Sequence, residues 1–104
     1  MEGIWYAHFK LGESYGDGVA VLHNGLIEGA DPLHTYSGSY QEDGSHVYAN
    51  VRVSPYQGAS QPADLSHPIT FFFKGSVTGN SAQVEGHPDN RPDALVSVEL
   101  HKGC

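Results

Sequence analysis

A chain of 104 residues has room for one hydrophobic core, so we expect residues 1–104 to form a single domain. Thirteen glycines and six prolines predict many turns, which suits short strands better than long helices. The 12 acidic and 5 basic residues give a net charge of −7, which argues against direct binding to nucleic acid or to an anionic membrane. This charge favours a basic protein partner or simple solubility.

The first forty residues alternate between apolar segments and turn signals. Asn24-Gly25 stands between two apolar segments and is a strong hairpin signal, because both residues readily take positive φ. Gly38 lies inside a strand-like segment, where a glycine predicts a bend or a bulge. We therefore expect strands at residues 4–11, 19–23, 26–29 and 35–40, a turn at residues 12–18 and a break at Asp31-Pro32.

Two later segments alternate with the period of two that indicates a half-buried strand. Every second residue from Val47 to Val53 is apolar, and residues 94–100 repeat the pattern. Residues 69–73 include three consecutive phenylalanines, which suggests that both faces of this strand are covered. We expect a further strand at residues 82–85, turns at 42–45 and 78–80, and loops at 54–68 and 87–93.

These segments predict an all-β protein, a meander of about eight antiparallel strands. A small up-and-down barrel is the natural closure because it leaves no open edge, and a two-sheet sandwich is the alternative. Side chains nearly fill the interior of an eight-stranded barrel or leave room for one small ligand. In the second case Phe71 and Phe73 are the expected lining.

The chain shows no pattern of catalytic or metal-binding residues, so we predict neither an enzyme nor a cofactor. It has no Gly-x-Ser-x-Gly motif, and a hairpin turn explains Gly16-Asp17-Gly18 better than a phosphate-binding loop does. No histidines form a His-x-His or a helical i, i+4 pair, although neighbouring strands could still bring some of them together. The seven are His8, His23, His34, His46, His67, His87 and His101.

The cysteine content and the N-terminus predict a cytoplasmic protein. Cys104 is the one cysteine, so an internal disulfide is impossible. The first residues show no basic segment followed by an apolar one, as a signal peptide would, and no apolar run is long enough to span a membrane as a helix.

The order of motifs over residues 3–53 resembles a known family. The motifs are Gly3-Ile4-Trp5-Tyr6, Gly16-Asp17-Gly18, the apolar residues 19–22, Asn24-Gly25, Ile27-Glu28-Gly29-Ala30-Asp31 and Tyr36-Ser37-Gly38. This succession resembles the GrlR-like family, the negative regulators of type III secretion, and residues 95–102 are similar to its closing strand. The resemblance implies a lipocalin-like eight-stranded barrel that pairs into a homodimer and sequesters a transcriptional activator through an exposed acidic motif.

That acidic motif falls on Glu42 and Asp43 of this chain, where Gly44-Ser45 replaces its second acidic pair. We therefore expect Glu42 and Asp43 to bind a basic protein partner from an exposed turn. The leading prediction is a regulatory protein that binds such a partner, and the alternative is a carrier or sensor of a small apolar ligand held inside the barrel.

Overall fold

The computed structural model describes residues 1–55 and 68–103, which form eight strands and no helix. Among these residues there is consequently no helix that could cross a membrane. Cys104 and most of the loop expected at 54–68 lie outside the described residues. The strands are β1 Gly3–Leu11, β2 Ser14–His23, β3 Leu26–Ala30, β4 His34–Asp43, β5 His46–Pro55, β6 Ile69–Thr78, β7 Ser81–Pro88 and β8 Val96–Lys102.

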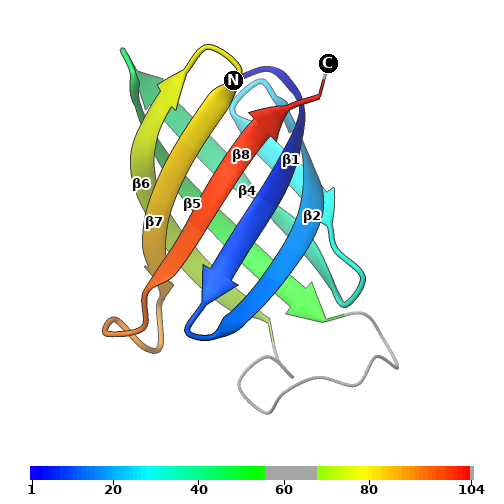
Figure 1. The fold of residues 1–104 in the computed structure, drawn as a ribbon, viewed down its shortest axis with the longest axis vertical. Helices are drawn as coiled ribbons and strands as arrows, with labels where there is room; N and C mark the ends of the chain where they lie inside the picture. The colour runs from blue at the N-terminus through cyan, green and yellow to red at the C-terminus, as the bar shows by residue number, and fades with distance from the viewer. Residues whose placement is uncertain (56–67, 104) are drawn as a thin grey trace.

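Each strand pairs antiparallel with the next one in the chain, and β8 pairs with β1 to close the barrel (Figure 1). The closing pair runs from Trp5 opposite Lys102 to Leu11 opposite Val96. The predicted all-β, up-and-down, eight-stranded barrel is therefore confirmed. The sandwich alternative is wrong, because the first and last strands pair with each other and leave no open edge.

The hairpin predicted at Asn24-Gly25 joins β2 and β3. His23 lies opposite Leu26, so the loop has two residues, with φ of 52° at Asn24 and 79° at Gly25. Two consecutive positive φ angles match a type I′ turn, whose twist fits that of the flanking strands. The Gly25 carbonyl also accepts a hydrogen bond from the Tyr40 backbone at 2.9 Å, which ties the turn to β4.

The turn expected at residues 12–18 is much shorter than predicted, because β2 already begins at Ser14. Gly16 and Gly18 lie within this strand, and both make room for aromatic rings. A Cβ at Gly16 would overlap the ring of Phe9, and one at Gly18 would lie 3.2 Å from the ring of Tyr36. These glycines serve packing inside the barrel rather than chain reversal.

Several other predicted boundaries are wrong because the strand ladders extend further than the local sequence suggests. β4 continues through Asp43, which lies opposite His46, so only Gly44 and Ser45 form the turn. Ser54 and Pro55 belong to β5, and β7 runs on to Pro88. In contrast, β8 begins two residues later than expected, because the Ala94 backbone N–H donates to the Arg91 carbonyl in a turn at 3.0 Å.

The alternation predicted for residues 47–53 is confirmed in β5. Val47 is buried and the apolar residues that follow at every second position are partly buried, whereas the residues between them are exposed. The bulge considered at Gly38 is absent, since β4 and β5 pair without interruption. Gly38 instead permits a close approach of the two strands, because a Cβ there would overlap the Asn50 carbonyl oxygen.

Candidate functional site

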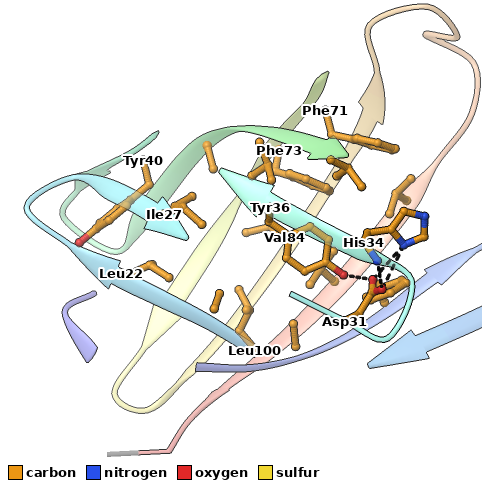
Figure 2. Close-up of a pocket in the computed structure, with 18 of the residues that line it drawn as sticks. Leu22, Ile27, Asp31, His34, Tyr36, Tyr40, Phe71, Phe73, Val84 and Leu100 are labelled. Carbon is orange, nitrogen blue, oxygen red and sulfur yellow. Dashed lines mark hydrogen bonds and ion pairs between the residues drawn. The ribbon is translucent and has the colours of Figure 1, made fainter. Parts of the chain in front are cut away.

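The inward side chains of the barrel leave a cavity of about 230 Å³ (Figure 2). Its lining is almost entirely apolar and comes from strands all around the barrel. Phe71 and Phe73, which the sequence predicts as lining residues, both lie there, with their rings stacked at a centroid distance of 6.0 Å and an interplanar angle of 7°. Between them Phe72 faces outward. The interior is thus not filled by side chains, and a role in ligand binding remains a prediction.

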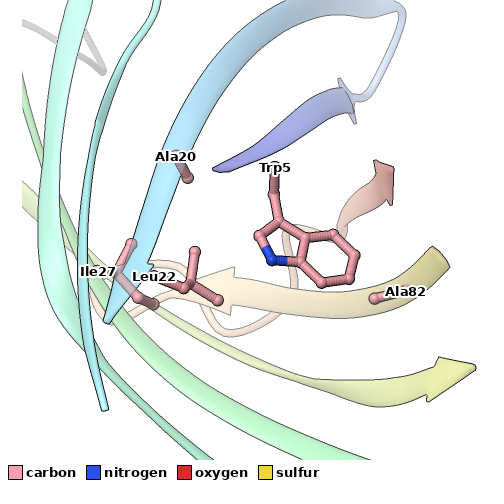
Figure 3. Close-up of a cluster of buried hydrophobic side chains, with 5 residues drawn as sticks. All are labelled: Trp5, Ala20, Leu22, Ile27 and Ala82. Atoms are coloured by element: carbon pink, nitrogen blue, oxygen red, sulfur yellow. The ribbon is translucent and has the colours of Figure 1, made fainter. Parts of the chain in front are cut away.

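A cluster of buried side chains fills the barrel at the end where β1 begins and β2 ends, which we name the upper end (Figure 3). Trp5 is its largest member and is only 1% exposed. It packs with Leu22, Ile27 and Ala82, and its indole Nε1 donates a hydrogen bond to the Met1 carbonyl at 3.2 Å. The indole ring is therefore packed among apolar side chains, and its single N–H donor has a hydrogen-bond acceptor.

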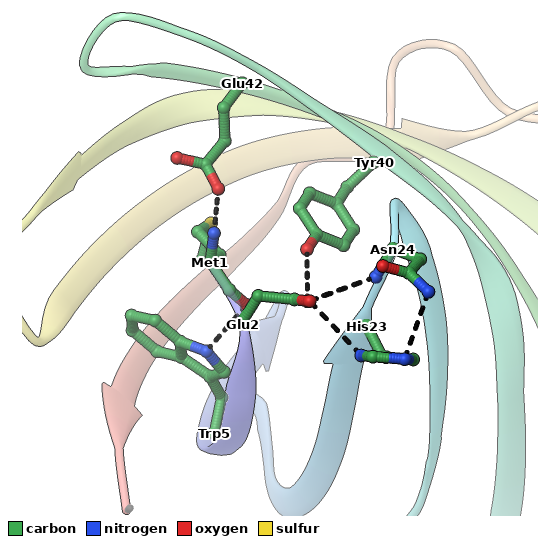
Figure 4. Close-up of polar contacts among 7 residues, drawn as sticks. All are labelled: Met1, Glu2, Trp5, His23, Asn24, Tyr40 and Glu42. Atoms are coloured by element: carbon green, nitrogen blue, oxygen red, sulfur yellow. Dashed lines mark hydrogen bonds and ion pairs between the residues drawn. The ribbon is translucent and has the colours of Figure 1, made fainter.

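Glu2 connects several elements at the same end (Figure 4). Its carboxylate accepts hydrogen bonds from the Asn24 backbone at 3.1 Å and from the Tyr40 hydroxyl at 3.3 Å, and it lies 3.2 Å from His23 Nδ1. The pKa of Tyr40 is raised, first by burial of the phenol and then by the nearby Glu2 charge and the hydrogen bond to Glu2. A backbone hydrogen bond at Gly25 acts in the opposite direction.

A buried polar cluster lies at the opposite, lower end of the cavity, where the chain passes from β3 to β4. The Asp31 carboxylate accepts hydrogen bonds from the backbones of Leu33 at 2.7 Å and His34 at 2.8 Å, and from the Tyr36 hydroxyl. His34 Nδ1 lies 3.1 Å from Oδ1 and 3.2 Å from Oδ2 of the same carboxylate. Only 5% of the Asp31 side chain is exposed, and these contacts make its burial tolerable.

The second ring nitrogen of His34 is the unusual atom of this cluster. His34 is 8% exposed and lines the cavity, and its Nε2 is buried without a hydrogen-bond partner among the described residues. Figure 2 shows Nδ1 turned toward Asp31 and Nε2 turned away from it. Buried polar atoms in proteins are rarely left unpaired, so this nitrogen is an exception.

The sequence did not mark Asp31, His34 and Tyr36 as a site. It predicted Asp31-Pro32 only as a break between two strands, and it treated His34 as one of the scattered histidines. A signal was nonetheless present: in a strand, His34 and Tyr36 share one face, and an aspartate before a strand commonly accepts backbone hydrogen bonds two or three residues on.

The acidic pair Glu42 and Asp43 lies at the end of β4 rather than in a turn. The Glu42 carboxylate forms an ion pair with the amino group of Met1, so its charge is partly neutralised within the molecule (Figure 4). Asp43 is exposed. Glu42 is exposed as well, so the expected exposure of both carboxylates is confirmed, and the two differ in that the Glu42 carboxylate is paired within the molecule.

Four of the six histidines in the described residues pair with carboxylates, and the rings of His8 and His101 also contact each other edge to face at 6.1 Å, whereas His67 lies outside the described residues. Over residues 1–55 and 68–103, no three His, Cys, Asp or Glu side chains are grouped in a way that could hold a metal ion. The histidine–carboxylate pairs are His8 with Asp17, His23 with Glu2, His34 with Asp31 and His101 with Glu99.

Comparison with known proteins adds no relative to this description. No family model matches the chain, and no curated protein matches it closely enough to count as a relative.

Proposed function

We propose that this protein binds a small apolar ligand inside its barrel. The observation that carries the proposal is the almost wholly apolar cavity of about 230 Å³. An apolar cavity of about 150 Å³ is enough to hold benzene, whereas pockets for drug-sized ligands span roughly 300–1,000 Å³. The cavity therefore fits a ligand somewhat larger than benzene and smaller than most drugs.

The hydrophobic effect supplies the driving force for such binding. Each Å² of apolar surface that leaves water contributes about 25 cal/mol, and a closed barrel wall offers contact on every side. Phe71 and Phe73 present stacked, rigid rings, so a flat or short-chain ligand makes many contacts while few side chains lose freedom.

Titration with 1-aminoanthracene, a small apolar dye that fluoresces more strongly when it leaves water, tests the proposal. We expect saturable binding of one dye per chain. Phe73→Asn, which places a polar group in the cavity lining, should weaken the binding, whereas Phe72→Asn on the outer face should not. Circular dichroism of both variants shows whether the barrel is intact. Absence of saturable binding to the folded wild-type protein would overturn the proposal.

The predicted protein-binding role is the second candidate, and the exposed Asp43 favours it. In this proposal Asp43 and Glu42 contact lysine or arginine side chains of a basic partner, helped by the net charge of −7. The resemblance to the GrlR-like family would make that partner a transcriptional activator and the protein a lipocalin-like, cytoplasmic regulator of type III secretion. Because Glu42 already pairs with the Met1 amino group, we place this role after ligand binding.

A further inference from the structure

We propose that a second copy of this chain docks on the outer face of β4 to β7, with Lys74 of each copy against Glu85 of the other. This docking is independent of ligand binding inside the barrel. A hollow crosses the outer face of these strands, lined mainly by exposed side chains, and we name it the outer hollow. Two large exposed aromatic residues, Tyr48 and Phe72, belong to its lining and leave apolar surface in contact with water.

The strand register arranges the outer hollow as two rows of side chains that cross the strands. In one row Tyr48 lies opposite Lys74, and Lys74 lies opposite Glu85. In the other row Phe72 lies opposite His87, and the centroids of their rings are 6.0 Å apart with the planes tilted by 58°. This contact supports the Phe72 ring before anything docks, so docking costs little side-chain freedom.

The charges of the outer hollow indicate which partner fits it. The chain has 12 acidic and 5 basic residues, but the lining of the hollow has one of each, Glu85 and Lys74. A nucleic acid requires a basic surface and a basic protein requires an acidic one, and a balanced face is neither. Two copies of an acidic protein repel each other least where their facing surfaces carry no net charge. A second copy is therefore the occupant that the charges favour.

Lys74 and Glu85 are also available for contacts with another molecule. They are opposite each other in β6 and β7, yet neither side chain forms an ion pair or a hydrogen bond within residues 1–55 and 68–103. A twofold axis that lies in the interface, between β6 and β7 and parallel to them, brings Lys74 of each copy over Glu85 of the other. The same rotation covers Phe72 with His87 of the second copy, because twofold contacts are reciprocal.

The aromatic and the charged residues have different roles in this interface. Tyr48 and Phe72 supply affinity, since buried aromatic side chains dominate the energy of most interfaces. Exposed ion pairs add little affinity, but like charges that face each other oppose association strongly. Lys74 and Glu85 therefore determine how the two copies align, and reversing one of these charges is the most sensitive change.

The test measures dimer dissociation constants by sedimentation equilibrium for the wild type, Lys74→Glu and Glu85→Lys. Each reversal places like charges at both reciprocal contacts and should weaken the dimer at least tenfold. An equimolar mixture of the two variants should associate about as tightly as the wild type, because lysine faces glutamate at both contacts of the mixed dimer. Circular dichroism shows whether each variant is folded.

Lys102→Glu is the matched control, because it changes the net charge as Lys74→Glu does but lies in β8, outside the outer hollow. Alone it should keep the wild-type dissociation constant. Mixed with Glu85→Lys it should not restore full affinity, since one contact still places lysine against lysine. Full restoration by this mixture would show that net charge alone controls the association, and would overturn the proposal.

A second measurement needs no variant. In wild-type protein mixed from ¹⁴N- and ¹⁵N-labelled chains, a carbodiimide should join Lys74 of one chain to Glu85 of the other, giving peptides of mixed isotope in mass spectrometry. Absence of these peptides would overturn the proposal, as would a wild-type protein that stays monomeric at the highest soluble concentration. Single reversals that dimerise like the wild type would place the contact on another face and overturn it too.

Discussion

The hydroxyl of Tyr40 in β4 lies 3.3 Å from Oε2 of Glu2, the residue just before β1. This hydrogen bond spans 38 positions of the chain and joins β4 to the residue that precedes β1, a strand that is not its neighbour in the barrel. Together with the contacts of Glu2 to Asn24 and His23, it connects the start of β1 with the β2–β3 turn and with β4 at the upper end.

The raised pKa of Tyr40 predicts a loss of stability in alkali. The folded protein holds the phenol proton to higher pH than the unfolded chain, whose tyrosines titrate near 10.0. The stabilisation is complete below pH 10 and is lost as the pH rises through the folded-state pKa. Ultraviolet titration of tyrosinate should show a step above pH 10 that Tyr40→Phe removes.

Glu2→Gln should move that step downward without abolishing the shift, because burial is the larger cause and the Glu2 charge the second. A Tyr40 pKa that is the same with and without the Glu2 charge would contradict this account of the upper end.

Phe71→Ala should destabilise the barrel far more than Phe72→Ala, although the two residues are adjacent. Phe71 is buried in the wall of the cavity, and truncating a buried phenylalanine typically costs about 3–5 kcal/mol. Phe72 is 42% exposed, so its truncation should cost clearly less. Urea unfolding of both variants measures the difference. Similar losses for the two would show that the inward and outward assignments are wrong.

Gly75→Ala should destabilise the protein by about 1–3 kcal/mol or more, the usual range for overpacking. A Cβ at Gly75 would overlap the backbone carbonyl of Gln83, so β6 and β7 would have to move apart. The control is Gly79→Asn in the following turn. Gly79 has a φ of 58° and open space around it, and asparagine tolerates this conformation, as Asn24 shows. Thermal unfolding should leave the control close to wild type.

Replacing Glu42 and Asp43 by alanine should change the free energy of unfolding by less than about 1 kcal/mol, because exposed ion pairs contribute little. In the second proposed function, the same change weakens capture of a basic partner from the native host, and added salt weakens capture by the wild type. Equal capture by both proteins across a salt series would show that another surface binds the partner.

A homodimer remains a prediction, and the outer face of β5 and β6 is where we expect the second copy. Phe72 and Tyr48 are exposed large side chains on these neighbouring strands. Twofold pairing is the commonest way to cover such a surface. Sedimentation equilibrium at micromolar concentration should give twice the chain mass of 11.2 kDa, and Phe72→Asp should give the single mass. A wild-type protein that stays monomeric at much higher concentration would contradict the dimer.

The local sequence alone determined which strands alternate between inward apolar and outward polar residues. It also determined the two-residue turn at Asn24-Gly25. The regular apolar positions from Val47 to Val53 place one face inward whatever the neighbouring strand is, because successive side chains point to opposite sides. Asn24-Gly25 likewise specifies a two-residue turn by its own backbone preferences. Strand ends were less predictable, since residues such as Ser14 and Asp43 have weak strand preferences and are held by the ladder of a partner strand.

Only the tertiary structure decided where the polar cluster lies. Strand periodicity places His34 and Tyr36 on one face, but the mixed residues of β4 do not tell which face is the interior. Closure of β1 against β8 settles that question, because it converts one side of every strand into a cavity wall. Asp31, Phe71 and Phe73 then line a common space although 40 positions separate Asp31 from Phe71, and no local preference encodes such a meeting.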